Sequence, residues 1–309
     1  MKELRFEKVR DFEYGLNTHQ PAQLYSCEDM ADFEVLYERE LTYDNIVNLN
    51  FITNILSEFF DVNAVAISKH ENCCGLALAA TIDEAYDKAF DCDPVSSFHG
   101  VIGFTKPFDI ETASHINSMG VRFIVAPDFD KNVVELFEQN ESIKLVKLKT
   151  PLQNLRRMCS EEVKITPFGV LVQGKNDSNL DKDLFKVITK TKPTSEQIED
   201  AIFAWKAVKH LRTDSAVVVK DFNVKGISQG NTNSIAAVEN ALNSACDGSK
   251  DSVIAIDGAI TTQEIIFAAI QGRVKLIIHG GSDKDKEMAA LADKYELAII
   301  STGIKNYRY

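Results

Sequence analysis

The chain has 309 residues, more than a single hydrophobic core usually supports, so we expect two packed units. Its formal net charge of -12 disfavours a nucleic-acid partner, because a phosphate backbone binds to a basic face. No stretch approaches the roughly 18 apolar residues that span a membrane, and the N-terminus lacks an apolar signal segment. These features predict a cytoplasmic protein without a membrane partner.

Short apolar runs alternate with amphipathic patterns along the chain, which is typical of an α/β protein with mostly buried sheets. β-branched runs predict strands at 62–68, 121–126, 216–220, 252–256, 273–279 and 296–301. Amphipathic patterns predict helices at 81–90, 195–211 and 284–295. The segments 115–127 and 267–280 both contain a helix end, a glycine and a strand, as a duplicated unit would.

A polar, turn-rich stretch at 175–195 separates two parts of the chain. It ends at a strong helix start, for which either Thr194 or Ser195 supplies the side-chain signal. We therefore expect one domain over residues 1–190 and a second over 191–309.

The segment SKHENCCG at 68–75 follows a predicted strand and carries two proton-handling groups, Lys69 and His70. Ligand sites of α/β proteins form at such strand ends. Both side chains reach one ligand only if the backbone turns, and Asn72 and Gly75 predict such a turn. The alternative is a solvated lysine beside an incidental histidine, which spacing alone favours.

The same segment lacks the spacing of a zinc site. Glu71 directly follows His70, and Cys73 and Cys74 are adjacent, whereas zinc deaminases use H-x-E and P-C-x-x-C. Adjacent cysteines rarely bind one tetrahedral metal, so we expect no metal here. The six cysteines are expected to be reduced, because no spacing indicates a disulfide framework.

Two glycine-containing loops lead into predicted helices. One interpretation of HGGSDKDKE at 279–287 is that its backbone amides hold a phosphate or a carboxylate. The alternative is that Ser282 or Asp283 is the N-cap of the helix. The segment GISQGNTNS offers amide groups to a polar ligand, or Thr232 or Asn233 is a helix cap. Spacing alone does not decide between these alternatives.

Seven segments follow one another in a recognisable order. They are EYGLNTHQ (13–20), KHENCCG (69–75), DPVSSFHG (93–100), PTSEQIEDAIFAWKAVKHLRTDSAVV (193–218), GISQGNTNS (226–234), DGAITTQE (257–264) and HGGSDKDKEMAALADKYELAIISTGIKNYRY (279–309). In order and wording they resemble the formyltransferase half of the family that joins aminoimidazole-carboxamide ribonucleotide (AICAR) formyltransferase to IMP cyclohydrolase. The corresponding family segments begin RYGxNPHQ, KHxNPCG and DPxSAFGG, and the resemblance spans essentially the whole chain.

The resemblance implies two cytidine-deaminase-like α/β units in tandem, used without zinc, and a homodimer with active sites shared across the interface. It implies formyl transfer from the co-substrate 10-formyltetrahydrofolate to the 5-amino group of AICAR in purine nucleotide biosynthesis. An active chain is then a phosphoribosylaminoimidazolecarboxamide formyltransferase. The cyclohydrolase half normally precedes the RYG-like segment, and only a short segment precedes Glu13, so we expect that half to be absent.

The resemblance implies catalytic roles for Lys69, His70 and Asp214, and it includes Asn72 among the substrate-binding residues. His70 would accept the proton of the amine as general base. Lys69 would orient the substrate and stabilise the oxyanion on the formyl group. Asn72 would support the turn, and Asp214 stands where an asparagine orients the formyl oxygen.

The resemblance also implies substrate-binding positions. Tyr14 would reach the nucleotide of a neighbouring subunit, and Lys305 stands where the family has a basic, phosphate-compatible residue. By the same correspondence Asn17, His99 and Asn231 belong to the substrate-binding set.

Several ligand positions depart from the family pattern. Glu13 replaces an arginine, Asp214 an asparagine, and Ser234 a basic residue. His99 stands in place of a glycine, and Asn231 in place of a glutamine. A carboxylate at 214 opposes a developing oxyanion unless it is protonated or paired with a cation.

The aromatic FFPF wall that would stack the folate reads AITT, Ala259 to Thr262, in this chain. Losing its aromatic faces removes most of a pterin platform. These changes favour an alternative, a catalytically impaired homologue that is a nucleotide-binding or regulatory protein. A third hypothesis is a different small molecule in the same cleft, one without a phosphate.

Overall fold

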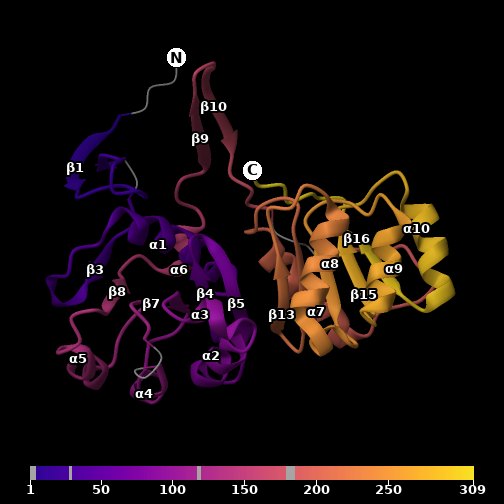
Figure 1. Cartoon of the computed structure of the whole chain (residues 1–309), viewed down its shortest axis with the longest axis horizontal. Helices are drawn as coiled ribbons and strands as arrows, with labels where there is room; N and C mark the ends of the chain where they lie inside the picture. Colours follow the sequence, from indigo (N-terminus) through magenta and orange to yellow (C-terminus); the bar gives the residue numbers. More distant parts are fainter. Residues whose placement is uncertain (1–4, 28–29, 117–119, 179–184) are drawn as a thin grey trace. The chain divides into compact units, whose positions relative to one another are not determined.

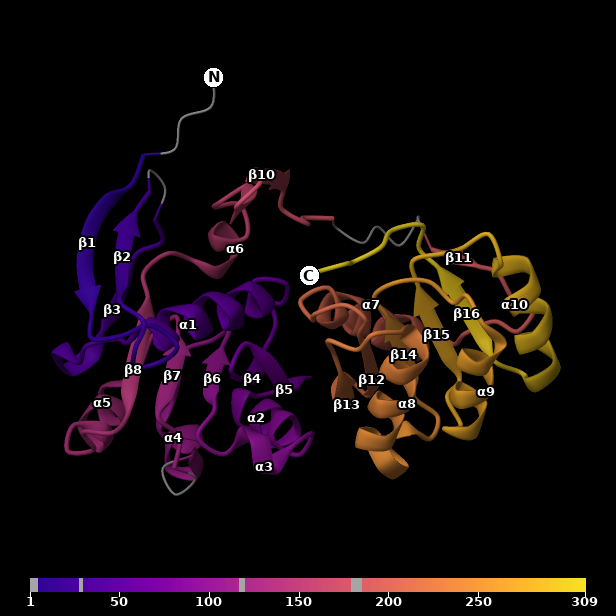
Figure 2. The ribbon, with the colours of Figure 1, turned by 45° about the horizontal axis from the view of Figure 1, so that its top comes forward.

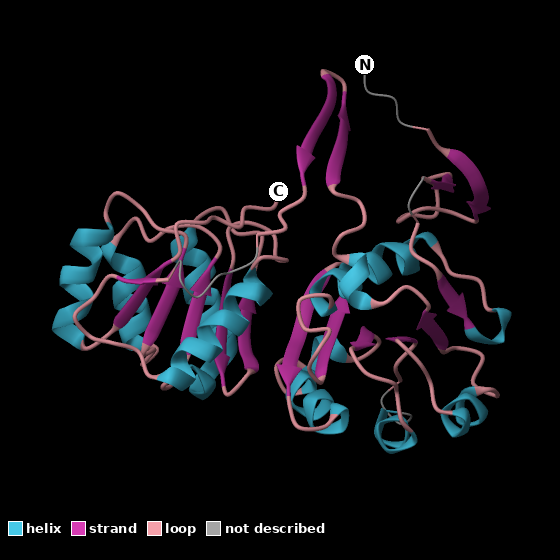
Figure 3. Ribbon diagram, turned by 180° about the vertical axis from the view of Figure 1, so that it is seen from behind, coloured by secondary structure: helices cyan, strands magenta, loops and turns pink. Residues whose placement is uncertain are grey.

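The protein is described by a computed structural model that covers residues 5–27, 30–116, 120–178 and 185–309 (Figure 1). The chain divides into two compact units. The first unit comprises residues 1–71, 80–83 and 95–177, and the second comprises 72–79, 84–94 and 178–309. Residues 179–184 of the predicted boundary stretch lie outside the described residues. In each unit, strands form one layer with helices packed against it, so the predicted α/β class is confirmed (Figure 3).

The sheet of the first unit has the strand order β4–β6–β7–β8–β3. β6, β7 and β8 are parallel to one another, whereas β4 and β3 pair antiparallel with β6 and β8. The bounds are β3 (Phe33–Val35), β4 (Ala64–Lys69), β6 (Val101–Phe104), β7 (Phe123–Ala126), β8 (Lys144–Leu148), α1 (Tyr43–Leu56), α3 (Pro94–Ser97), α4 (Ile110–Ile116), α5 (Lys131–Phe137) and α6 (Leu152–Leu155).

Helix α1 packs against β4 and β6. It begins with a capping box in which Thr42 and Asn45 exchange hydrogen bonds between side chain and backbone. A Cβ atom on Gly103 would lie 2.6 Å from Leu56 Cδ1, so the missing side chain lets the helix approach the strand.

Two hairpins complete the first unit, β1 (Glu7–Phe12) with β2 (Ala22–Ser26) and β9 (Glu161–Thr166) with β10 (Gly169–Gly174). The second hairpin extends away from the sheet of its unit (Figure 1). Every residue of β10 is exposed, which explains why no buried-strand pattern predicts it.

The sheet of the second unit has the order β11–β16–β15–β14–β12–β13–β5. β14, β15 and β16 are parallel, and their arrowheads point to one edge in Figure 2. The bounds are β5 (Asn72–Leu78), β11 (Lys186–Val187), β12 (Ala216–Lys220), β13 (Asn223–Ser228), β14 (Val253–Ile256), β15 (Leu276–His279), β16 (Ala298–Ser301), α2 (Ile82–Phe90), α7 (Ser195–Val208), α8 (Ser234–Ala245), α9 (Gln263–Gln271) and α10 (Asp285–Ala292).

Alternate residues of these strands face opposite sides of the sheet. Val218, Ile254 and Ile277 belong to one buried cluster together with residues of α8, α9 and α10. No residue of α7 belongs to that cluster, yet α7 contacts β12, β14 and β15. Helix α7 therefore covers the other face, and the strands between are buried on both sides, as their apolar runs predict.

The order of elements occurs twice along the chain. α1–β4–β5–α2–β6–α4–β7–α5–β8 is followed by α7–β12–β13–α8–β14–α9–β15–α10–β16. The short helix α3 interrupts the first series between α2 and β6, and α6, β9, β10 and β11 lie between the two series. α1 and α7 each have 14 residues and a capping box, and α7 begins with Thr194 as its cap. The paired segments 115–127 and 267–280 fall on α4–β7 and α9–β15, apart from residues 117–119, which lie outside the described residues.

In both repeats a glycine in the second strand allows the following helix to pack closely against that strand. A Cβ atom on Gly75 of β5 would lie 1.9 Å from the carbonyl oxygen of Ala89 in α2. A Cβ atom on Gly226 of β13 would lie 2.2 Å from the carbonyl oxygen of Ala241 in α8. Gly75 is therefore a packing residue inside a strand, and the prediction that it forms the turn after Lys69 is wrong.

Candidate functional site

Five loops of the second unit meet at one edge of its sheet. The parallel strands β14, β15 and β16 end there. β12 is antiparallel to β14 and begins there, and β13 is antiparallel to β12 and ends there. The loops are 212–215, 229–233, 257–262, 280–284 and 302–309. Ligand sites of α/β proteins form at such carboxyl edges.

Asp214 and Asn231 are brought together across this edge. Each backbone N–H donates to the other's carbonyl oxygen at 3.1 Å, and Asn231 Nδ2 also donates to Asp214 O at 3.0 Å. The hydroxyl of Ser234 donates to Oδ1 of Asp214 at 3.1 Å. The Thr213–Asp214 peptide bond is cis. Asn233, one of two predicted caps, is the cap of α8 and accepts from the amide of Ala236.

Asp257 lies close enough to Asp214 to interact with its charge, and it is fully buried. Its Oδ2 accepts a hydrogen bond from the Thr213 hydroxyl at 2.7 Å, and its Oδ1 accepts from the Ser215 amide at 3.1 Å. Burial raises the pKa of Asp257, and the negative charge of Asp214 adds to that rise. Sequence reasoning missed this residue, whose only signal is its place directly after a predicted strand.

The C-terminal tail is attached to the same edge. The amide of Asn306 donates to the carbonyl oxygen of Asp257 at 2.8 Å. The amide of Thr213 donates to the carbonyl oxygen of Arg308 at 2.9 Å. Because Asn306 is buried, the alternate residues Lys305 and Tyr307 are exposed on the other side of the tail.

Tyr307 packs over the backbone that follows β14. A Cβ atom on Gly258 would lie 2.9 Å from Tyr307 Cε1, so only glycine allows this contact. Lys305 Nζ lies 5.6 Å from the centroid of the Tyr307 ring. Burial raises the pKa of Tyr307, and the charges of Asp257 and Asp214 add to that rise. Lys305 is therefore part of the same edge as Asp214 and Asn231.

The glycine loop after β15 uses its amides within the protein. Gly280 N donates to Gly258 O at 2.7 Å, Gly281 N to His279 Nδ1 at 3.2 Å, and Ser282 N to Asp285 Oδ1 at 2.7 Å. Three successive donors are thus engaged, which disfavours the phosphate hypothesis for this loop. The helix α10 begins after Lys284, so the cap predicted at Ser282 or Asp283 is wrong.

Lys69 and His70 lie at the end of β4 in the first unit. The chain turns through His70 and Glu71, with φ of 54° and 57°, so the turn lies before Asn72, which begins β5. Lys69 Nζ donates to the carbonyl oxygen of Phe98 at 3.3 Å. His70 is exposed, so its imidazole is accessible to a ligand.

His99 lies close to Lys69, just before β6. Its φ is 63°, and its Nδ1 is 2.9 Å from the carbonyl oxygen of Gly120. Its ring packs edge-on against Phe98, with centroids 4.3 Å apart. Lys69 and His99 are therefore held near one another through Phe98.

Tyr14 and Asn17 occupy the loop between β1 and β2. Asn17 Nδ2 donates to Gln20 Oε1 at 2.8 Å, and the amide of Gly15 donates to Gln20 O at 2.8 Å. Glu13 is exposed in the same loop. These contacts order the loop itself and connect it to neither group of candidate residues.

A cavity of about 100 Å³ in the second unit is lined by the thiols of Cys73, Cys74 and Cys92, together with Ser228 and Gln229 among others. Burial raises the pKa of Cys92 to about 12 and raises that of Cys73 as well. The thiols of Cys73 and Cys92 are therefore protonated at neutral pH and unfavourable as nucleophiles.

A family model and curated relatives each match most of the chain. A family model described as AICARFT/IMPCHase bienzyme matches residues 1–244. The bifunctional purine biosynthesis protein PurH of Thermoanaerobacter sp. (strain X514) is 35% identical over 309 residues, which cover 98% of this chain and 60% of that protein. The PurH of Caldicellulosiruptor saccharolyticus is 36% identical over 311 residues, with the same coverage. The chain thus spans about 60% of the length of these relatives.

One solved structure, Acinetobacter baumannii RibD, form 2, matches 33% of each chain at 16% identity with a TM-score of 0.23, which is too low for an inference about the fold. Within the described part of the chain, no helix combines the length and apolar character that crossing a membrane requires.

Proposed function

We propose that this chain, which belongs to the AICARFT/IMPCHase bienzyme family, transfers the formyl group of 10-formyltetrahydrofolate to the 5-amino group of AICAR. The observation that carries the proposal is the turn after β4, which presents the exposed His70 beside Lys69. Each repeat is, in this proposal, a cytidine-deaminase-like unit that works without zinc, with the boundary between them near residue 190.

The proposed reaction forms one C–N bond and breaks another. The amine nitrogen of AICAR attacks the formyl carbon, and His70 accepts the proton that the amine loses. The ammonium group of Lys69 stabilises the oxyanion that develops on the formyl oxygen. Collapse of the tetrahedral intermediate releases N10 of tetrahydrofolate, which leaves with a proton.

A homodimer with shared sites is part of the proposal, and the repeat supports it. Lys69 and His70 lie where β4 ends and the parallel strands of the first unit begin. Asp214, Asn231 and Lys305 lie where the parallel strands of the second unit end. The two groups thus occupy opposite edges of equivalent sheets. In a homodimer, the group around His70 of one protomer and the group around Asp214 of its partner are able to contact the same ligand.

A catalytically impaired, nucleotide-binding homologue is the second candidate function. It is supported by Asp214, a carboxylate that accepts a hydrogen bond from Ser234, because the resemblance implies a neutral amide at position 214 that orients the formyl oxygen. Glu13, which takes the place of an arginine, and the absence of an aromatic wall at Ala259–Thr262 further favour this homologue. A third candidate is a protein that binds a different small molecule, without a phosphate, in the same cleft.

An assay of the purified chain with both substrates, following tetrahydrofolate release, separates these functions. Turnover supports the formyltransferase, and absence of turnover refutes it. Thermal melting with AICAR then decides between the remaining two, because a ligand that binds only the folded state raises its melting temperature. No shift at high AICAR excludes the nucleotide-binding homologue.

A further inference from the structure

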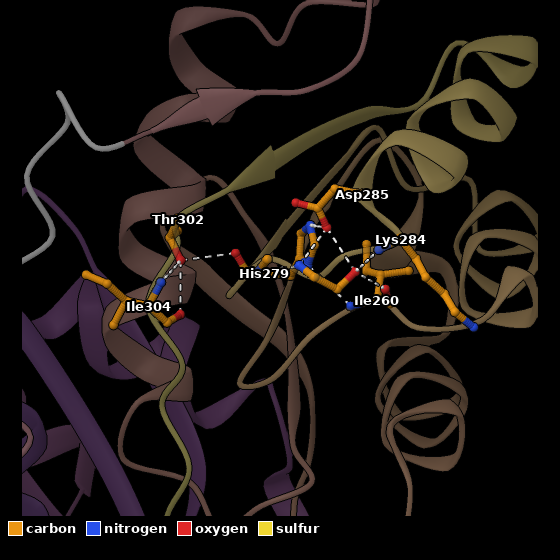
Figure 4. Close-up of polar contacts among 8 residues, drawn as sticks. Ile260, His279, Lys284, Asp285, Thr302 and Ile304 are labelled. Atoms are coloured by element: carbon orange, nitrogen blue, oxygen red, sulfur yellow. Dashed lines mark hydrogen bonds and ion pairs between the residues drawn. The ribbon is translucent and has the colours of Figure 1, made fainter.

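The segment Ala259–Thr262 is held in place by His279, the last residue of β15, and by side chains of the loop that follows it (Figure 4). His279 Nδ1 accepts a hydrogen bond from the amide of Ile260 at 3.2 Å. The hydroxyl of Ser282 donates to the carbonyl oxygen of Ile260 at 2.9 Å, and Lys284 Nζ donates to that of Thr261 at 3.0 Å. Three side chains thus fix three consecutive peptide groups, from Ala259 to Thr262.

His279 is the buried member of this set. Its side chain is fully inaccessible to solvent, and Nδ1 accepts from the amides of both Ile260 and Gly281 at 3.2 Å. A nitrogen that accepts two N–H groups carries no proton, so the proton of the neutral ring resides on Nε2. Nε2 faces Asp285 Oδ1 at 3.7 Å, and burial lowers the pKa of His279 to about 4.

The held segment adjoins the candidate site. It begins next to Asp257 and Gly258, which contact Thr213 and Tyr307 respectively. Ala259 and Ile260 are buried, whereas Thr261 is exposed. The backbone position of this segment, more than its small side chains, therefore determines the shape that a ligand meets there.

We infer that His279 is a positioning residue, whose neutral imidazole fixes the backbone of Ala259–Thr262 and thereby sets the affinity for the planar folate co-substrate. The inference rests on the proposed function for the identity of the ligand. The positioning itself rests on the contacts of Nδ1. The half-buried Ser282 and the exposed Lys284 hold the same segment through its carbonyl oxygens.

Two substitutions of His279 distinguish the effect of losing the Nδ1 acceptor from the effect of replacing the imidazole ring. His279→Asn places an amide oxygen near the position of Nδ1 and keeps an acceptor for Ile260 and Gly281. His279→Gln places its amide near Nε2 and leaves both backbone donors without that acceptor. Leaving a buried donor without its acceptor changes an equilibrium constant by roughly tenfold, which is about 1.4 kcal/mol.

Hydrogen exchange and kinetics on both variants test the inference. In His279→Gln we expect the peptide containing Ile260 to exchange about tenfold faster, and KM for 10-formyltetrahydrofolate to rise about tenfold. kcat and KM for AICAR should stay within about twofold, and His279→Asn should remain close to wild type in every measurement.

Equal exchange in the two variants would overturn the positioning role, as would equal increases in KM for both substrates. Exchange in a peptide of the first unit reports general unfolding and is expected to be unchanged. Absence of wild-type turnover would refute the proposed function alone, because the exchange experiment still decides whether His279 orders the segment.

Discussion

Ser234 Oγ donates a hydrogen bond to Asp214 Oδ1 across 3.1 Å, which joins two departures from the family pattern into one local change. The family pattern has an asparagine and a basic residue at these two places. Here a carboxylate and a hydroxyl satisfy one another at the carboxyl edge of the second sheet. The changes of charge at positions 214 and 234 are therefore coupled, and the two positions are best substituted together.

Reversing both positions should restore an anion-binding site. We expect Asp214→Asn with Ser234→Arg to tighten AICAR binding about tenfold, because a charge-assisted hydrogen bond to phosphate contributes about 1.5–3 kcal/mol. Ser234→Arg alone should gain less, since the guanidinium would pair with Asp214. Calorimetric titration measures both, and the riboside without its phosphate is the control. An equal gain for the riboside would contradict the explanation.

Gly75 should tolerate no side chain. Gly75→Ala places a Cβ 1.9 Å from the carbonyl oxygen of Ala89, so β5 and α2 have to separate. We expect the free energy of unfolding to fall by about 1–3 kcal/mol in urea titration. Gly174→Ala is the matched control, because no heavy atom lies within 4 Å of its added Cβ. Equal stability of the two variants would refute the packing role.

Asp257 should anchor the C-terminal tail. The Thr213 hydroxyl accepts from the Arg308 amide and donates to Asp257 Oδ2, at 2.9 and 2.7 Å. In Asp257→Ala the Thr213 hydroxyl and the Ser215 amide both lose their acceptor, which we expect to cost about 1–3 kcal/mol and to accelerate hydrogen exchange in residues 302–309. Thr213→Val breaks the same link without changing charge and should loosen the tail similarly. Wild-type exchange of the tail in both variants would exclude the anchoring role.

His279 should make stability depend on pH. Its pKa is about 4 in the folded chain and 6.5 when unperturbed. Between these values the unfolded state binds the proton and the folded state does not. Its contribution is therefore fully present above about pH 6.5 and is lost as the pH falls toward about 4. Urea unfolding across this range should show a steeper loss for wild type than for His279→Asn. Parallel curves would contradict the assignment.

The strands buried on both faces were predictable, and the exposed or interrupted ones were not. β12, β14, β15 and β16 are continuous apolar runs, so composition alone predicts them. β13 contains Lys225 and Gly226, and β5 contains Gly75, which interrupt the pattern that predicts a strand. The hairpin turns that precede them contain no glycine, although all four of their residues have positive φ.

The candidate site was predictable only in part. The resemblance selects Asp214 and Asn231, but their mutual contact depends on the pairing of β12 with β13 and β14. Asp257 acquires its role from burial and from the Thr213 hydroxyl, and neither follows from local sequence. The contact of His279 with Ile260 likewise arises from the parallel pairing of β14 and β15.

The most direct test of the proposed function is the initial rate of tetrahydrofolate formation with saturating AICAR and 10-formyltetrahydrofolate, compared between wild type and His70→Asn. Asparagine tolerates the φ of 54° at this turn, so the variant removes the base and keeps the backbone. We predict turnover by wild type. In His70→Asn we predict that kcat decreases by at least about 100-fold while the melting temperature is unchanged. No turnover by wild type, or a wild-type kcat in His70→Asn, would contradict the assignment of His70 as the general base of a formyltransferase.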